Sequence, residues 1–199
     1  MRTGDVSEGC PERSLFYIYC AQMCRYYDIP SCGVAGTTDS KINDVQSGIE
    51  KAATMITTAL AGYNLNYDAA GSINSVLTTS LEGMVIDDEL YGFIKRVLAG
   101  VDFSPQTVRR SLDVIKDVAG SGRSFLTERH TKDKLREEHW IPNLTDRRRY
   151  EVFERSEDRD IMDFAKSKVK RILEEHEPLP LPEGATERIV EIVGRAQSQ

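Results

Sequence analysis

The residues best suited to chemistry lie in one polar stretch between residues 38 and 51. Its candidates for substrate binding are Asp39, Lys41, Asp44, Gln46 and Glu50. The stretch joins a short apolar segment, expected to be a strand, to the start of an expected helix. Enzymes built as α/β barrels place their functional groups at such junctions. The alternative interpretation is a loop that caps the helix and carries solvated charges.

A second candidate site lies at the end of the next expected strand. Asn66-Tyr67-Asp68 ends an alternating segment, and the small residues Ala69-Ala70-Gly71-Ser72 follow directly. Small side chains allow a bulky ligand to approach the backbone closely. The alternative interpretation is a packed tyrosine followed by a capping aspartate.

The elements that must position these residues are mostly helices. Ser104-Pro105 combines a capping residue with proline at the first helical position, which is a strong start signal. Helices are expected at residues 11–26, 44–61, 87–98, 105–120, 157–175 and 186–196, with one more capped by Thr127. For the second of these helices the expected apolar stripe is Ile49, Ala52, Ala53, Ile56, Ala59 and Leu60.

Short strands are expected at residues 29–34 and 63–68. Strands that alternate with helices favour a parallel sheet with crossover helices. A closed barrel of this kind needs eight strands and about 250 residues, more than this chain provides. The pattern therefore predicts an α/β fold. Residues 1–155 would form part of a TIM (β/α)8 barrel, and residues 156–199 a helical C-terminal extension.

Composition excludes several classes of partner. The chain has 199 residues and a formal net charge of −6, and Arg147-Arg148-Arg149 is its one basic run. Three positive charges on an acidic chain are too few for a nucleic-acid footprint. No apolar run approaches the roughly 18 residues of a membrane span, and no signal peptide is visible. We therefore expect a cytoplasmic protein with neither nucleic acid nor membrane as partner.

Two further groups of residues could suggest metal binding. The four cysteines, Cys10, Cys20, Cys24 and Cys32, lack the close paired spacing of structural zinc sites, so reduced thiols are expected. The run Asp87-Asp88-Glu89 most simply favours the positive end of a helix, and a metal site is the less favoured alternative. We therefore expect no metal site.

Several ordered motifs together resemble the trimethylamine methyltransferase family. They are Thr38-Asp39-Ser40-Lys41 with Asp44, Gln46, Gly48 and Glu50-Lys51; Ala61-Gly62-Tyr63-Asn64-Leu65 with Asp68-Ala69-Ala70-Gly71; Ser80-Leu81-Glu82 with Val85 and Asp87-Asp88-Glu89; and Phe125-Leu126-Thr127, His130-Thr131, Trp140, Pro142, Leu144 and Asp146-Arg147-Arg148. No single motif is decisive, but the ordered set spans nearly the whole chain. Members of the family are full barrels more than twice this long. The resemblance therefore implies that this chain supplies the last few βα units.

The resemblance also implies a reaction. A methyl group would pass from trimethylamine, or from a quaternary amine of the glycine betaine type, to the Co(I) of a corrinoid carried by a partner protein. This chain would then bind no cofactor directly. Relatives without pyrrolysine act on quaternary amines, and this sequence contains no pyrrolysine. For the full-length protein we expect a homo-oligomer.

The expected site residues follow from the chemistry of a methylated cation. Carboxylates attract such a cation, and aromatic rings do so by about 0.5–2 kcal/mol. Tyr67 and Asp68 are therefore the expected catalytic pair, and Ser72 an expected substrate-binding residue. Among all candidates we favour Asp39, Gln46 and Asp68. His130 begins a helix, where histidine is more often a surface residue, but near a barrel mouth it could face the corrinoid.

Two other interpretations remain open. The chain could be a catalytically inactive barrel fragment that acts only by associating with its missing N-terminal half. It could also be an unrelated helical binding module, which would be a compact monomer without βα units.

Overall fold

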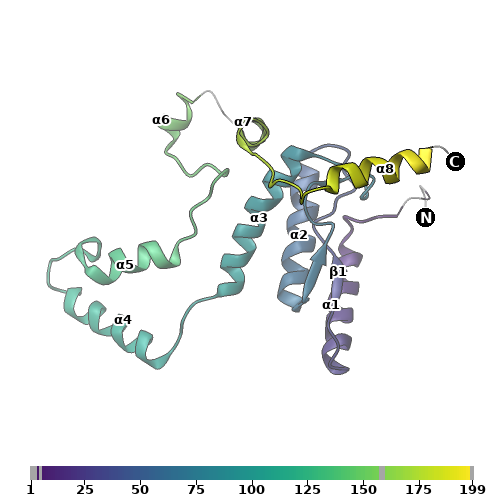
Figure 1. Cartoon of the computed structure of the whole chain (residues 1–199). Coiled ribbons are helices and arrows are strands. Elements are labelled where there is room, and N and C mark those ends of the chain that lie inside the picture. Colours follow the sequence, from purple (N-terminus) through teal and green to yellow (C-terminus); the bar gives the residue numbers. More distant parts are fainter. Residues whose placement is uncertain (1–3, 5, 157–159, 198–199) are drawn as a thin grey trace. The chain divides into compact units, whose positions relative to one another are not determined.

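The structure is a computed structural model that describes residues 4, 6–156 and 160–197 (Figure 1). Internal contacts divide the chain into two units, Met1–Val169 and Lys170–Gln199. The sequence pattern places a boundary earlier, after residue 155. Part of the helix expected at 157–175 falls on residues 157–159, which lie outside the described residues.

Helices dominate both units. The first contains α1 (Pro11–Tyr26), β1 (Cys32–Val34), α2 (Val45–Ala61), β2 (Leu65–Tyr67), β3 (Ser72–Ile73), β4 (Thr78–Thr79), α3 (Leu81–Ala99), α4 (Pro105–Val118), a short 3-10 helix (Phe125–Thr127), α5 (Arg129–Glu138) and α6 (Tyr150–Phe153). Helix α7 (Ile161–Glu175) begins in the first unit and ends in the second, which also holds α8 (Ala185–Gln197).

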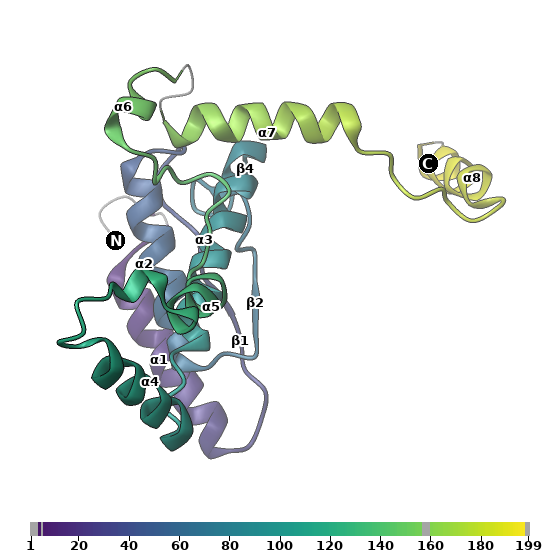
Figure 2. The same cartoon turned by 90° about the vertical axis from the view of Figure 1, so that its left-hand side faces the viewer.

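Strands β1 and β2 pair in parallel, with Val34 opposite Tyr67 (Figure 2). Helix α2 connects them, so the three elements form one βαβ unit. The parallel pair expected from the sequence is therefore present, although each strand is shorter than expected. Within the described residues this sheet has two strands, and the closed eight-stranded barrel stays a prediction.

Two asparagines on the β2 side fix the register of this pair. At the start, the Asn64 Oδ1 accepts the backbone N–H of Ser31 at 2.9 Å. At the end, the Asn66 amide bonds both backbone groups of Ala35, accepting its N–H at 2.8 Å and donating to its carbonyl at 3.1 Å. These side chains stand in for backbone partners just beyond the short ladder.

One face of β1 lies under two tyrosine rings. Tyr17 of α1 and Tyr63 form an edge-to-face pair with centroids 5.7 Å apart. A Cβ atom on Gly33 would lie 2.8 Å from the Tyr63 ring, so only glycine leaves room for it. The absence of a side chain at residue 33 thus lets this aromatic pair lie close to the strand.

Helix α2 packs against α1 and α3 (Figure 1). The Asp44 side chain caps its start by accepting the Ser47 N–H at 2.9 Å, as the sequence predicts. Gly62 ends it in the left-handed conformation, with φ of 85°. Met55 of α2 forms a small core with Ala69 and Ile94.

The buried face of α2 matches the expected apolar stripe only in part. Ile56 and Ala59 pack against the core, but Ile49 and Leu60 are 64% and 63% exposed. The fully buried residues are instead Ser47, Lys51, Thr54, Met55 and Thr58. The threonine hydroxyls tolerate burial because each donates to a backbone carbonyl one turn earlier, at 2.8 Å for Thr54 and 2.7 Å for Thr58.

The expected start of the third long helix was wrong. Helix α3 begins at Leu81 and is capped by Ser80, whose hydroxyl accepts the Gly83 N–H at 3.1 Å. Asp87 and Glu89 therefore lie inside the helix, and both are buried. The sequence interpretation placed them at the positive end of a helix, and this was wrong. Two smaller differences are the β3–β4 hairpin, which was not expected, and the cap of α5, which is Glu128 and not Thr127.

Glu89 joins α3 to a distant segment. Its carboxylate accepts the backbone N–H groups of Asn143, Leu144 and Thr145 at 3.0 Å, and also the Thr145 hydroxyl at 3.0 Å. Burial raises the pKa of Glu89, and these hydrogen bonds lower it by a larger amount. The pKa of Glu89 is therefore below its ordinary value. The core beside it is formed by Val85, Leu144 and Ala165.

We predict that Glu89→Gln destabilises the chain by about 1–3 kcal/mol at pH 7, because buried N–H groups lose an ionised acceptor. The folded-state pKa is depressed, so this stability is present above the unfolded pKa of about 4.3 and is lost as pH falls through the folded pKa. Urea unfolding at several pH values measures the difference. Asp88→Asn, at an exposed position of the same helix, is the control. An equal loss in both variants, or one that persists in acid, would contradict the anchoring role.

Candidate functional site

The loops that follow β1 and β2 meet at the carboxyl ends of the two strands. The Asn74 N–H donates to the Ser40 carbonyl at 2.7 Å, and the Ser75 N–H donates to the Thr38 carbonyl at 2.9 Å. Parallel pairing brings both loops to the same edge of the sheet, where α/β enzymes place their chemistry. This edge is the candidate functional site.

Asp39 lies at the centre of this edge. Its carboxylate accepts three donors: the Ser7 hydroxyl at 2.6 Å, the Glu8 N–H at 2.8 Å and the Ser75 hydroxyl at 2.8 Å. Burial raises the pKa of Asp39, but these hydrogen bonds lower it to below its ordinary value, so the carboxylate is ionised at neutral pH. A carboxylate has about four lone-pair sites, and with the Gly9 N–H, which also lowers this pKa, protein donors occupy nearly all of them.

Glu50 holds the same loop from the helix side. Its Oε2 accepts the Thr38 hydroxyl at 2.5 Å and the Asp39 N–H at 2.8 Å. Its Oε1 accepts the amide of Gln46 at 2.8 Å. Thr38 is fully buried, whereas Gln46 is exposed. Gln46 therefore bonds Glu50, and Glu50 bonds the loop, while their substrate-binding roles stay predictions.

Asp44 and Lys41 are exposed on the same segment. Asp44 acts as the cap of α2, and the Ser47 N–H that it accepts lowers its pKa. This is the alternative that the sequence left open for this residue. The Lys41 ammonium donates to the Asp39 backbone carbonyl at 2.7 Å. Lys41 therefore brings a positive charge beside Asp39.

A cavity of about 400 Å³ opens between the N-terminal segment and the two loops. Its lining residues are Val6, Ser7, Asp39, Lys41, Asn74, Ser75 and Leu77. One carboxylate and one ammonium face it, together with hydroxyl and amide groups. The arrangement can hold a small polar molecule that carries a positive charge, or charges of both signs.

Tyr67, Asp68 and Ser72 do not line this cavity. Tyr67 ends β2 and is 49% exposed. Asp68 is exposed and has a φ of 57°, a left-handed conformation that aspartate tolerates better than most residues. Ser72 is buried in β3. Their proposed catalytic and substrate-binding roles stay predictions.

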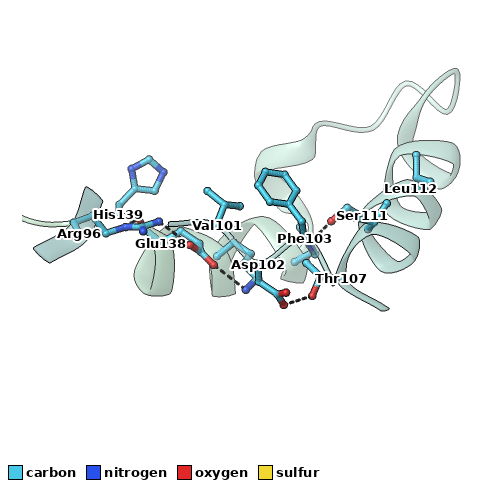
Figure 3. Close-up of a pocket in the computed structure, with 12 residues that line it drawn as sticks. Arg96, Val101, Asp102, Phe103, Thr107, Ser111, Leu112, Glu138 and His139 are labelled. Atoms are coloured by element: carbon cyan, nitrogen blue, oxygen red, sulfur yellow. Dashed lines mark hydrogen bonds and ion pairs between the residues drawn. The ribbon is translucent and has the colours of Figure 1, made fainter. Parts of the chain in front are cut away.

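His130 lines a different cavity, of about 560 Å³, which shares no lining residue with the first (Figure 3). Its Nε2 lies 3.5 Å from the Ser111 hydroxyl. In Figure 3 the side chains of Val101 and Phe103 also line this cavity. The structure thus does not bring His130 together with Asp39, and its predicted role near the corrinoid stays a prediction.

The sequence interpretation missed Lys51 and Asp87 as a pair. The Lys51 ammonium lies 2.6 Å from the Asp87 Oδ2, and their side chains are 3% and 1% exposed. The same Oδ2 accepts the Gly71 N–H at 2.7 Å. The local sequence gives no clear signal for either residue, because Glu50 precedes Lys51 and Asp88-Glu89 follow Asp87. The pairing itself joins residues far apart in the chain, which no local pattern reveals.

Neither a metal-ligand cluster nor a membrane-spanning helix occurs among the residues that the structure describes. No three histidine, cysteine, aspartate or glutamate side chains in this part of the chain come together as a metal site. None of its helices combines the length and apolar character of a membrane span. The four cysteines are free thiols.

Comparison with known proteins identifies the family. A family model described as trimethylamine methyltransferase (MTTB) matches residues 1–199. A glycine betaine methyltransferase of Desulfitobacterium hafniense strain Y51 is 35% identical over 153 residues, which is 77% of this chain and 31% of that protein. The trimethylamine methyltransferase MttB of Methanosarcina thermophila is 33% identical over 181 residues, covering 91% and 36%. MttB2 of Methanosarcina mazei is 34% identical over 197 residues, covering 98% and 39%.

The chain thus spans about a third of the length of the curated relatives it matches. Since the family model covers all of its residues, the resemblance seen in the ordered motifs is confirmed. The chain belongs to the trimethylamine methyltransferase family.

Proposed function

We propose that this chain is a segment of a methyltransferase that moves a methyl group from a methylated amine to the Co(I) of a corrinoid held by a partner protein. Family membership over the whole chain supports the reaction class. The observation that carries the site is the ionised Asp39 carboxylate on a cavity at the carboxyl ends of two parallel strands. A fixed negative charge there suits a methylated cation.

The reaction asks little covalent chemistry of the protein. The N–CH₃ bond would break and leave its electron pair on the departing amine nitrogen, while a corrinoid on the partner protein would supply the electron pair that accepts the methyl carbon. The corrinoid supplies the nucleophile, so this chain's task is to bind the amine and aim one methyl group at the acceptor. A quaternary ammonium is already a leaving group and needs no proton. A tertiary amine must first be protonated or quaternised.

The charges at the cavity favour a zwitterionic amine. Asp39 can face the methylated ammonium, and Lys41 can face a carboxylate on the same molecule. Trimethylamine lacks a carboxylate and would leave Lys41 without a ligand contact. We therefore propose an amine of the glycine betaine type as the preferred substrate.

The segment's strands support a larger sheet. A parallel sheet of two strands is unusually small, and parallel sheets normally have both faces covered. Yet Leu65 of β2 is 60% exposed, and Phe16 of α1 is 66% exposed. We propose that further polypeptide completes these elements into a (β/α)8 barrel, which acts in the cytoplasm as a homo-oligomer. The same exposed residues favour the second candidate, an inactive fragment that acts by associating with that missing part.

We predict that the isolated 199-residue chain transfers no methyl group from glycine betaine or trimethylamine to a Co(I) corrinoid, because the barrel is incomplete. The longer protein, produced from the reading frame extended upstream, should be active. The spectral change of Co(I) on methylation measures the rate for both. Turnover by the isolated chain would contradict its incompleteness, and inactivity of the longer protein with every methylated amine would contradict the reaction.

We predict that Lys41→Met in the longer protein lowers kcat/KM for glycine betaine about tenfold or more, equivalent to about 1.4 kcal/mol. The same variant should leave trimethylamine turnover nearly unchanged, because that amine has no carboxylate. Lys95→Met, at another exposed lysine, is the matched control. An equal loss for both amines would remove Lys41 from substrate recognition.

We predict that Asp68→Asn in the longer protein lowers methyl transfer by orders of magnitude and leaves the unfolding midpoint unchanged. Asparagine tolerates the left-handed backbone at this position, so the variant removes the charge without adding strain. Steady-state kinetics and thermal unfolding check the two halves of the prediction. A wild-type rate would exclude Asp68 from the catalytic site.

A further inference from the structure

A buried ion pair joins α2 to α3 just behind the candidate site. Lys51 and Asp87 approach to 2.6 Å, with side chains 3% and 1% exposed. Asn43 and Ser80 make a second link between the same helices near their starts, because the Asn43 amide donates to the Ser80 hydroxyl at 2.7 Å. These two links therefore hold the N-terminal halves of α2 and α3 together.

The ion pair is poorly built as a source of stability. The Asp87 Oδ1 is buried and has no hydrogen-bond donor among the described residues. Removing two charges from water is costly, and replacing such a pair with apolar residues of similar volume is often neutral or stabilising. What the pair contributes must therefore be sought in the position of the groups around it.

The group that it positions is the backbone of Gly71. The Asp87 Oδ2 accepts the Gly71 N–H at 2.7 Å, and the Gly71 carbonyl accepts the Ser80 N–H at 2.9 Å. Gly71 has a φ of 77°, and a Cβ atom there would lie 2.5 Å from Met84 Cγ and 2.7 Å from the Ser80 carbonyl. This residue is thus fixed at both of its polar groups and has no room for a side chain.

The 71–76 loop consists of Gly71, the two-residue strand β3 and the turn that leads to β4, and it reaches the candidate site. Asn74, Ser75 and Val76 all have left-handed backbones, with φ of 53°, 52° and 72°. Such conformations are costly, above all for β-branched valine, and persist only where the surroundings hold them. Ser75 then donates to the Asp39 carboxylate at 2.8 Å. One end of this strained loop is therefore held by Asp87 and the other end bonds Asp39.

We propose that the Lys51–Asp87 ion pair is a positioning element that fixes the loop of residues 71–76 against the Asp39 edge of the sheet. The Lys51 ammonium holds the Asp87 carboxyl group in the position where its Oδ2 meets the Gly71 N–H, and Gly71 sets where the loop begins. Lys51 and Asp87 do not line the Asp39 cavity, so they act through the loop. The consequence for methyl transfer rests on the proposed function, whereas the positioning of the loop does not.

Hydrogen–deuterium exchange of the 199-residue chain tests the proposal. The double variant Lys51→Met with Asp87→Leu replaces both side chains by apolar ones of similar shape and removes both charges, so we expect an unfolding midpoint close to that of the parent. The amides of residues 71–77 should nevertheless exchange at least tenfold faster. The amides of α2 should be unchanged. Asp87→Asn keeps an oxygen acceptor for the Gly71 N–H and should retain part of the protection.

The matched control is Arg129→Met with Asp133→Leu, which removes an exposed ion pair of α5. It should leave exchange in residues 71–77 unchanged. Unaltered protection of this loop in the Lys51–Asp87 double variant would overturn the proposal. So would a uniform loss of protection, because the pair would then support the whole unit. Hydrogen exchange does not depend on methyl transfer. If the loop exchanges faster in the double variant but the longer protein transfers no methyl group, only the proposed function is overturned.

Discussion

The parallel pairing of β1 with β2 is the constraint on which the candidate site depends. Because the two strands run in the same direction, both of their following loops emerge at one edge. Asn64 and Asn66 fix the register from either end, and Gly33 lets α1 approach the same strand through two tyrosine rings. A shift in register would separate the Ser40 and Asn74 backbones, and the two loops would no longer meet at the candidate site.

Around this edge, acidic side chains act mainly as anchors for backbone N–H groups. Asp39 holds Glu8, Glu50 holds Asp39, and Asp87 holds Gly71. Each carboxylate bonds a donor in another segment of the chain. Charge-assisted bonds of this kind are stronger than neutral ones, so they can hold irregular loops in place. In this chain, three acidic residues of the ordered motifs therefore hold loop backbone in place.

These hydrogen bonds to the carboxylates also bear on how a small methylated cation would be bound. Asp39 is ionised and has most of its lone pairs occupied by protein donors, so it is a rigid centre of negative charge. Preorganised charge of this kind needs no rearrangement when a ligand arrives. The loop that supplies Ser75 is strained and depends on neighbouring residues for its shape. The position of the Ser75 hydroxyl beside Asp39 therefore depends on residues outside the cavity.

The sequence by itself determined the features that depend on neighbours in the chain. The helix expected at residues 44–61 is α2, Ser104-Pro105 starts α4, and one short apolar segment and one alternating segment predict the parallel pair. The ordered motifs also identified the family. Local rules suffice here because caps, turns and hydrophobic runs act within a few residues.

Tertiary structure alone decided the rest. It turned the Lys51 face of α2 inward, placed Asp87 and Glu89 within α3, and left Tyr67 and Asp68 outside the cavity that Asp39 lines. Asp39, Asp87 and Glu89 find backbone partners 31, 16 and 54 residues away. A charge is tolerated in the interior only where such a partner arrives, and its arrival depends on how the whole chain folds.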